Sequence, residues 1–433
     1  MKRIILTCIC LALTFSLSSQ KLVDLYKKGT IRLVPDTEYA KGNDWNNIFR
    51  SYWDSTKTRH RGASKTLVLM PDGSVVVNHE SQNYYSLFSP QGTFVKEFTI
   101  KTSKGKPLKK SLPIEGIING NTFFTGIYNP GYVNCFDFNG KWTKTLKMDY
   151  TNRQMIALPN RKIAIAGWSL WKDATHEFVT IVDYDTNEEK IVWSNKTQEN
   201  RDAYVGSDGK KTTTDRSIFN YSYQFETSYY FNIPSSNEVG HIEPPIIACS
   251  GNKLLVALSE SGEIREYDLN GKFLSKKRVN WPVKTLSVSE LKQQQQERIN
   301  DFTMERFSKS LPTIPKEALK KAHSTILREM KEDLNRIIKP MSIPCFSTII
   351  KDSDGNLLFF EYPKEEARNV FHVWVYANGG SFVCQSSFVC DDYDLIINPS
   401  RMVFHKGYLY SLQKSKQASG VPLRLVRFKL TAN

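Results

Sequence analysis

Histidine and cysteine are scarce in this chain of 433 residues, which contains seven of each. The sequence has no Cys-x-x-Cys pair, no His/Cys cluster with zinc spacing and no Gly-x-Ser-x-Gly, His-Glu-x-x-His or P-loop pattern. These absences exclude the common local signatures of zinc sites, serine hydrolases, zinc proteases and P-loop nucleotidases. The sequence therefore indicates no cofactor and favours a non-enzymatic protein. A hydrolase or lyase that acts on an anionic sugar or a lactone is the alternative.

The cysteines do not form the pattern of a disulfide scaffold. Cys8 and Cys10 lie in the N-terminal apolar stretch, and the other five are sparse and odd in number. Buried free thiols are the favoured interpretation for most of them. Cys384 and Cys390 could instead pair with each other across a turn.

Long hydrophobic runs are missing, except at the N-terminus. Lys2 and Arg3 precede the apolar stretch Ile4–Leu17, and small residues follow it. This pattern predicts a signal peptide over residues 1–19, with an N-terminal anchor or a lipid on Cys8 as alternatives. No other run approaches the length of a membrane-spanning helix. We expect a secreted or periplasmic protein without a transmembrane segment in its mature part, and cell-surface association as a variant of this.

Positive charge exceeds negative charge, and the formal net charge is +15. For an exported protein, this excess favours a protein with an acidic surface or an anionic glycan as partner, rather than nucleic acid. A solvated basic surface without a specific partner is the alternative.

A doubled hairpin recurs along the chain. The stretch "IREYDLNGKFLSKKRV" (Ile264–Val279) has two strands around an Asn-Gly turn, and a second hairpin precedes it. This unit returns about every 40–45 residues, which is typical of propeller blades. The prediction is an all-β, six-bladed β-propeller within residues 20–433, with a pair of β-sandwiches as the alternative. The expected blades are 66–100, 113–148, 153–195, 243–280, 345–390 and 398–433, and the strand 29–36 is expected to close the ring.

The repeated Asp-Gly turn and Tyr-Asp-x-x-Gly-x-Phe pattern resembles secreted bacterial six-bladed propellers of the NHL/TolB-like type. The resemblance covers nearly the whole mature chain and implies the fold. Members include protein-binding modules, lyases and lactonases, so it implies no single activity. The third repeat departs from the pattern, because "NRK" and "TNEEK" stand where other repeats have glycine turns.

The long connections all belong to one face of the predicted propeller, opposite the short turns. The longest, residues 286–340, is predicted to contain two amphipathic helices, the first with a Ser287–Glu290 capping box. Apolar residues Leu319, Ala322, Ile326, Met330, Leu334 and Ile337 recur at helical spacing in the second. We expect this stripe to pack on the rim of the propeller. The lysine-bearing face is interpreted as solvated, with a membrane-surface role as the alternative.

Binding residues are expected on the loop-rich face. Tryptophan and tyrosine beside cations suit acidic sugars or a peptide. Two histidines and a glutamate on this face could in principle share a metal, although their spacing has no local signature and the sequence indicates no metal. Catalytic residues are not identifiable, and the candidate binding residues are His79, Trp168, Trp171, His241, Glu361, Tyr362 and Arg368.

Overall fold

The computed structural model divides into two compact units that are not contiguous in sequence. Unit 1 comprises residues 1–114, 137–142 and 348–433, and unit 2 comprises residues 115–136 and 143–347. The structure describes residues 22–50, 66–79, 84–107, 113–126, 132–148, 151–169, 176–194, 204–205, 211–212, 221–224, 230–233, 245–258, 261–279, 284–311, 314–338, 340–343, 346–361, 370–378, 380–397 and 400–432.

Unit 1 is built from antiparallel strands joined by short turns. One four-stranded sheet runs β2-β3-β4-β5, and a larger sheet runs β24-β25-β26-β27-β1-β31-β30-β28, with β29 paired to β30. Two short helices, α2 and α3, flank β1 in sequence. The bounds are α2 Leu22–Tyr26, β1 Thr30–Pro35, α3 Trp45–Ile48, β2 Leu67–Leu69, β3 Val75–Asn78, β4 Tyr85–Phe88, β5 Phe94–Phe98, β24 Phe346–Lys351, β25 Leu357–Glu361, β26 Val370–Tyr376, β27 Phe382–Val389, β28 Tyr393–Asp394, β29 Met402–His405, β30 Tyr408–Ser415 and β31 Leu423–Ala432.

Unit 2 contains three four-stranded antiparallel sheets, each with its strands in sequence order, and three two-stranded ribbons. Such sheets are the repeating element of β-propellers. The sheets are β6 Ile114–Ile118, β7 Thr122–Gly126, β8 Tyr132–Asp137 and β9 Trp142–Lys147; β10 Thr151–Leu158, β11 Lys162–Ser169, β12 His176–Asp183 and β13 Glu189–Ser194; and β18 Ile246–Ser250, β19 Lys253–Leu258, β20 Glu263–Asp268 and β21 Phe273–Arg278. The ribbons are β14 Tyr204–Val205 with β15 Lys211–Thr212, β16 Tyr221–Gln224 with β17 Tyr230–Ile233, and β22 Lys284–Leu286 with β23 Met341–Ile343.

The aspartate of the repeated turn has a structural role. In the β20–β21 turn, Asp268 Oδ1 accepts hydrogen bonds from the backbone N–H groups of Asn270 at 2.9 Å and Lys272 at 2.8 Å. Gly271 has a φ of +73°, a conformation that suits glycine. Asp137 and Asp352 accept backbone N–H groups in the same way at their turns. The motif therefore builds turns and is not a binding site.

Buried side chains fill the space between neighbouring sheets within each unit. In unit 2, one cluster joins the β6–β9 sheet to the β10–β13 sheet, and another joins the β10–β13 sheet to the β18–β21 sheet. In unit 1, one cluster includes Leu67 of β2 and Leu412 of β30. The all-β prediction with repeated four-stranded sheets is confirmed at this level.

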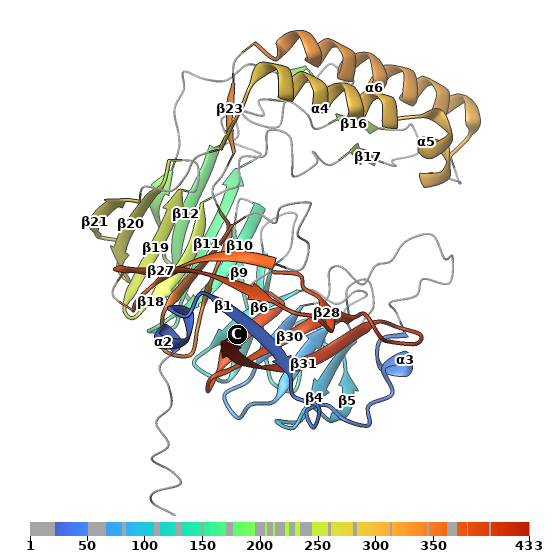
Figure 1. Ribbon diagram of the computed structural model, residues 1–433. Helices are drawn as coiled ribbons and strands as arrows, with labels where there is room; N and C mark the ends of the chain where they lie inside the picture. Colours follow the sequence, from blue (N-terminus) through green and yellow to red (C-terminus); the bar gives the residue numbers. More distant parts are fainter. Residues whose placement is uncertain are drawn as a thin grey trace, which may run out of the picture. The chain divides into compact units, whose positions relative to one another are not determined.

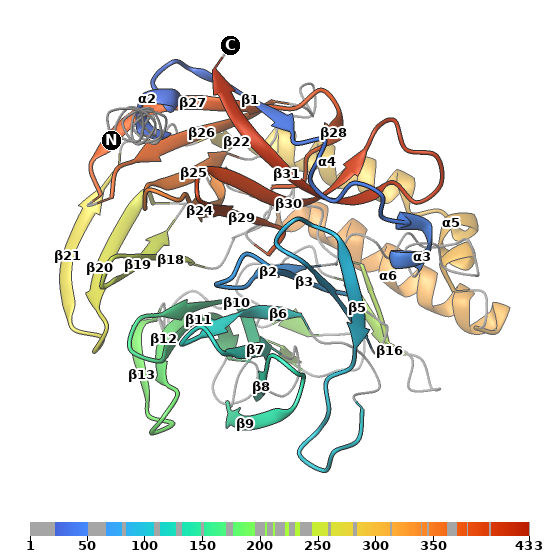
Figure 2. The ribbon, with the colours of Figure 1, turned by 90° about the horizontal axis from the view of Figure 1, so that it is seen from below.

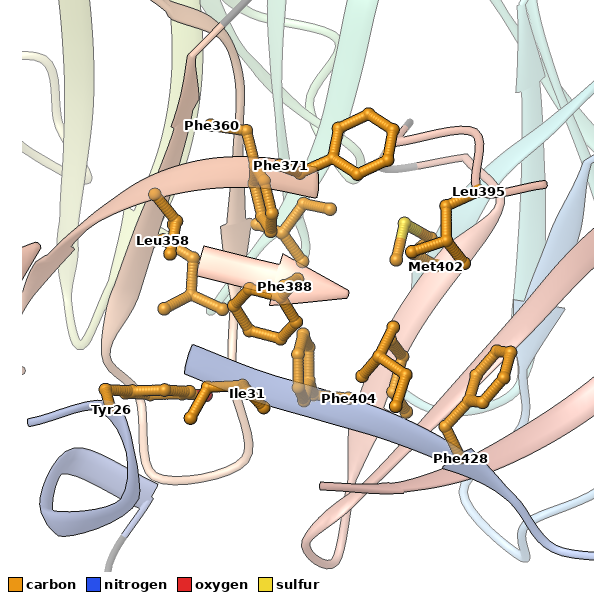
Figure 3. Packing of buried hydrophobic residues seen from close by; sticks show 14 of the residues in the cluster. Tyr26, Ile31, Leu358, Phe360, Phe371, Phe388, Leu395, Met402, Phe404 and Phe428 are labelled. Atoms are coloured by element: carbon orange, nitrogen blue, oxygen red, sulfur yellow. The ribbon is translucent and has the colours of Figure 1, made fainter. Parts of the chain in front are cut away.

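Strand β1 joins strands from near the end of the chain. It pairs antiparallel with β31, where Leu33 lies opposite Leu430, and parallel with β27, where Ile31 lies opposite Phe388. Figure 2 shows β1 running between these two strands. In Figure 3, the side chain of Ile31 lies near those of Phe388 and Tyr26 in the buried cluster of unit 1. The expected pairing of residues 29–36 with the chain end is therefore present.

Helix α2 fastens the start of this segment. The hydroxyl of Tyr26 donates to Asp352 Oδ2 at 3.1 Å, and the backbone N–H of Leu22 donates to Asp354 Oδ2 at 2.8 Å. Burial raises the pKa of Asp352, and hydrogen bonds from Asn356 and Tyr26 oppose that rise. We call residues 22–35 the N-terminal strap.

The question of a Cys384–Cys390 disulfide has a geometric answer. Both thiols are free, and Cys384 lies within β27 while Cys390 directly follows it. Cys390 follows Cys384 by six residue steps along an extended strand, which places their Cα atoms about 20 Å apart, whereas a disulfide needs less than about 7 Å.

Three helices, rather than the expected two, lie between β22 and β23: α4 Val288–Asp301, α5 Met304–Ser310 and α6 Lys316–Arg336. The predicted capping box of Ser287 and Glu290 is present at the start of α4. The expectation that the apolar stripe of α6 packs on the propeller rim is wrong. Leu319, Ile326 and Met330 pack against side chains of α4 and α5, in a core that the helices form among themselves. Figure 1 shows α4 and α6 side by side.

A short ribbon connects these helices to the rest of unit 2. Strands β22 and β23 pair antiparallel, and Leu286 and Met341 are direct partners. The two ends of the helical segment, residues 287–340, therefore lie next to each other. The segment is an insertion at the tip of a hairpin.

Candidate binding groove on helix α6

Short turns gather at one end of the strands in each unit. In unit 2, Lys162 Nζ, at the start of β11, donates to the carbonyl oxygen of Leu269 in the β20–β21 turn at 3.0 Å. In unit 1, the backbone N–H of Gly407, in the β29–β30 turn, donates to Ser353 Oγ in the β24–β25 turn at 3.0 Å. The ends of β3, β11 and β25, which carry sequence-derived candidates, are the opposite strand ends.

His79 follows β3 and is fully buried. Its Nε2 lies 2.8 Å from Ser86 Oγ, and its ring packs 4.5 Å from that of Tyr84 and 5.5 Å from that of Phe49, centroid to centroid. In this conformation, the imidazole contributes to the core of unit 1. Its proposed part in binding stays a prediction.

Glu361 ends β25 and is partly exposed. Its Oε1 accepts a hydrogen bond of 2.7 Å from the indole Nε1 of Trp374 on β26, which holds the carboxylate beside an aromatic ring. The backbone of Trp168 lies in β11, opposite Glu177 of β12. Trp171, His241, Tyr362 and Arg368 lie outside the described residues, so the seven candidates stay untested as one site.

Two kinds of feature are absent from the described part of the chain. No group of three or more His, Cys, Asp or Glu side chains there could hold a metal ion. No helix there is both long enough and apolar enough to span a membrane.

A groove of about 410 Å³ lies along helix α6. Because an α-helix turns by about 100° per residue, five of the six described lining residues lie on the side of α6 away from its buried stripe, whereas Leu327 packs against the core of the helical segment. The described residues that line it recur at three- and four-residue intervals: Ser324, Leu327, Arg328, Lys331, Glu332 and Asn335.

The groove carries more positive than negative charge. Arg328 Nε is 3.7 Å from Glu332 Oε1, which is longer than a hydrogen bond, and both side chains are more than half exposed. Lys331 has no ion-pair partner among the described residues. Lys321 lies two turns before Arg328 on the same face, and the nearby Glu317 is paired with Lys320 at 2.8 Å. Cations therefore predominate on this face.

The ribbon of β16 and β17 lies beside α6. Its register places Tyr221 opposite Ile233 and Tyr223 opposite Phe231, so these four positions share one face of the ribbon. Ser222, Gln224, Tyr230 and Asn232 belong to the other face. The ribbon and α6 are thus neighbours.

The sequence prediction did not identify the groove residues. It treated the outer face of α6 as solvated, because lysine and glutamate alternate along it. The signal was present in the spacing of Arg328, Lys331 and Asn335. However, the sequence does not place the ribbon of β16 and β17, which is about 100 residues away, beside this helix.

No family model matches the sequence, and no curated protein matches it. Three solved structures illustrate its likeness in fold. A member of the DUF4221 family from Bacteroides vulgatus is 10% identical, with 93% of this chain and 99% of that chain covered and a TM-score of 0.46. Virginiamycin B lyase from Staphylococcus aureus is 10% identical, with 93% of this chain and 99% of that chain covered and a TM-score of 0.37. A streptogramin B lyase is 11% identical, with 84% of this chain and 93% of that chain covered and a TM-score of 0.35. These low TM-scores carry no inference about activity or ligand.

Proposed function

We propose that the chain is an exported, six-bladed β-propeller of the NHL/TolB-like type that works as a binding protein. The sheets support the fold: unit 2 contains three four-stranded sheets, and unit 1 contains one four-stranded sheet and a larger sheet, in which β1 of the N-terminal strap adds a strand beside β31. The apolar N-terminal stretch supports export. The partner is a protein or an anionic glycan, held by the helical segment and the long connections.

The observation that carries this proposal is the helical segment. It has its own core, so its helices do not depend on the sheets to bury their apolar residues. It enters and leaves through adjacent residues of one ribbon, and the groove lies on the face of α6 away from the core. An independently packed module with an open polar groove is suited to recognition rather than to stabilising the sheets.

Replacement of the helical segment by a turn tests this proposal. Leu286 and Met341 face each other, so an Asn-Gly turn can join them directly. We expect this variant to keep the sheet signature in circular dichroism. The full chain should retain a partner from an envelope extract that contains both protein and polysaccharide, and the variant should not retain this partner. Retention of the same partners by both proteins would contradict the proposal.

The matched control changes the same ribbon without removing the helices. Insertion of Asn-Gly after Leu286 leaves α4, α5 and α6 in the chain. It should retain the partner if the helical segment, and not the ribbon, is the binding element.

A further inference from the structure

We propose that the groove on α6 is a subsite for a linear, carboxylated polysaccharide. This inference rests on the proposed function and specifies its ligand.

The shape favours a chain over an enclosed small molecule. The lining residues extend from Ser324 to Asn335, about three helical turns along one side of α6. The side chain of Arg328 is 69% exposed and that of Glu332 is 54% exposed, so the groove is open along its length. A polymer can lie along such a groove and continue beyond both of its ends.

The lining offers a group for each part of an acidic sugar. Arg328 and Lys331 can donate charge-assisted hydrogen bonds to carboxylates. Ser324, Asn335 and Glu332 can exchange hydrogen bonds with hydroxyl groups. Leu327, the only apolar residue among the described lining, packs partly against the core of the helical segment, and its exposed part can meet the apolar face of a sugar ring.

Arg328 and Lys331 lie almost one turn apart, so their positive groups succeed each other along the helix axis. A ligand with regularly repeated carboxylates fits this row better than a single anion does.

The same features make a protein partner the weaker choice for this groove. Stable protein interfaces have an apolar centre depleted of charge and bury on the order of 1,000 Å² or more. The described lining has one leucine among five polar or charged side chains. Acidic protein capture is therefore the competing outcome of the test.

Binding of fluorescent oligogalacturonate to the full chain tests the inference, with neutral dextran of equal length as the reference. We expect retention of oligogalacturonate but not of dextran, and weaker binding as salt screens the charges. The double variant R328S/K331S should weaken binding about tenfold or more, since each removes a charge-assisted contact.

The matched control removes two cations from the other helices. Lys292 on α4 and Lys309 on α5 are exposed and lie outside the groove. The variant K292S/K309S has the same net charge as R328S/K331S and should change the affinity less than about twofold, as expected for screened, distant charges. Circular dichroism should show equal helix content in both variants.

Equal weakening by the two double variants would overturn the inference, because the attraction would then be unspecific. Absence of oligogalacturonate binding would also overturn it. If the turn replacement still abolishes partner retention in that case, the proposed function stands and the ligand is of another class, such as an acidic protein. If the turn replacement has no effect, the proposed function itself fails.

Discussion

At the scale of single residues, two glutamine side chains bind backbone groups in the way that a neighbouring strand would. Gln413 on β30 is fully buried, and its amide accepts from the backbone N–H of Ile396 at 2.7 Å and donates to the carbonyl of Ile396 at 3.1 Å. Gln154 on β10 makes the same pair of bonds with Ile247 of β18, at 2.9 and 3.1 Å. In both places, a side-chain amide takes the place of a backbone partner.

We predict that Q413L lowers the free energy of unfolding by about 2–3 kcal/mol. The substitution keeps the volume but leaves the N–H and C=O of Ile396 without their partner. Urea unfolding measures the change. Q417L, at an exposed position of the connection that follows β30, should stay within about 0.5 kcal/mol of the native protein. Similar losses in both variants would show that the amide bonds at Ile396 contribute little.

The carboxyl group of Glu115 on β6 should make the stability of the protein depend on pH. Burial raises the pKa of this carboxyl from 4.5 to about 7. Between these values, the folded chain binds a proton that the unfolded chain releases, so the contribution of Glu115 to stability falls as the pH rises. We expect the free energy of unfolding of E115Q, relative to that of the native protein, to be higher at about pH 7.5 than at about pH 5.5.

Urea midpoints at these two pH values measure this difference. E38Q alters a surface carboxylate, whose side chain is 74% exposed, and should leave the difference between the midpoints unchanged. An E115Q variant that keeps the native pH dependence would contradict the assignment to Glu115.

At the scale of elements, β1 is a central strand although it comes from the start of the chain. Its burial pattern alternates, with Ile31 and Leu33 in the core and Arg32 and Val34 outside. The apolar alternation of "TIRLV" allowed the strand to be predicted, and the pairing with β31 followed from the missing fourth strand of the last repeat. The parallel contact with β27 was not predicted, because parallel pairing leaves no turn signal in the sequence.

We predict that I31A destabilises the protein by about 2–4 kcal/mol, as expected when a fully buried isoleucine leaves a cavity. Val34 on the same strand is 37% exposed. V34A should therefore lower the free energy of unfolding by at most about 0.5 kcal/mol beyond the effect of a surface substitution. Urea unfolding compares the two. Equal effects would mean that β1 is not held through its buried face.

The helices show where sequence patterns become ambiguous. The capping box of Ser287 and the apolar stripe of α6 fixed the helix positions well. A stripe does not say what covers it, however, and α5 contributes Phe307 to a core that the sequence assigned to the propeller rim. The partner of an apolar face depends on tertiary contacts that local periodicity does not contain.

At the scale of the whole molecule, the repeated hairpins made the sheets predictable, because each strand pairs with its neighbour in sequence. The binding groove was not predictable in this way. It lies on the outer side of α6, and no turn or spacing rule relates this helix to the ribbon near residue 225 that lies beside it. Candidates chosen at strand ends, such as His79, instead include side chains that fill a core.

The strap also determines when unit 1 can be completed. Ribosomes make the chain from its N-terminus, so Leu33 of β1 is synthesised about 400 residues before its partner Leu430. The strap must therefore wait for these residues before it can take its place. A nascent chain that stops before β31 keeps one edge of β1 open, so a stop codon just before Leu423 would leave this sheet unfinished.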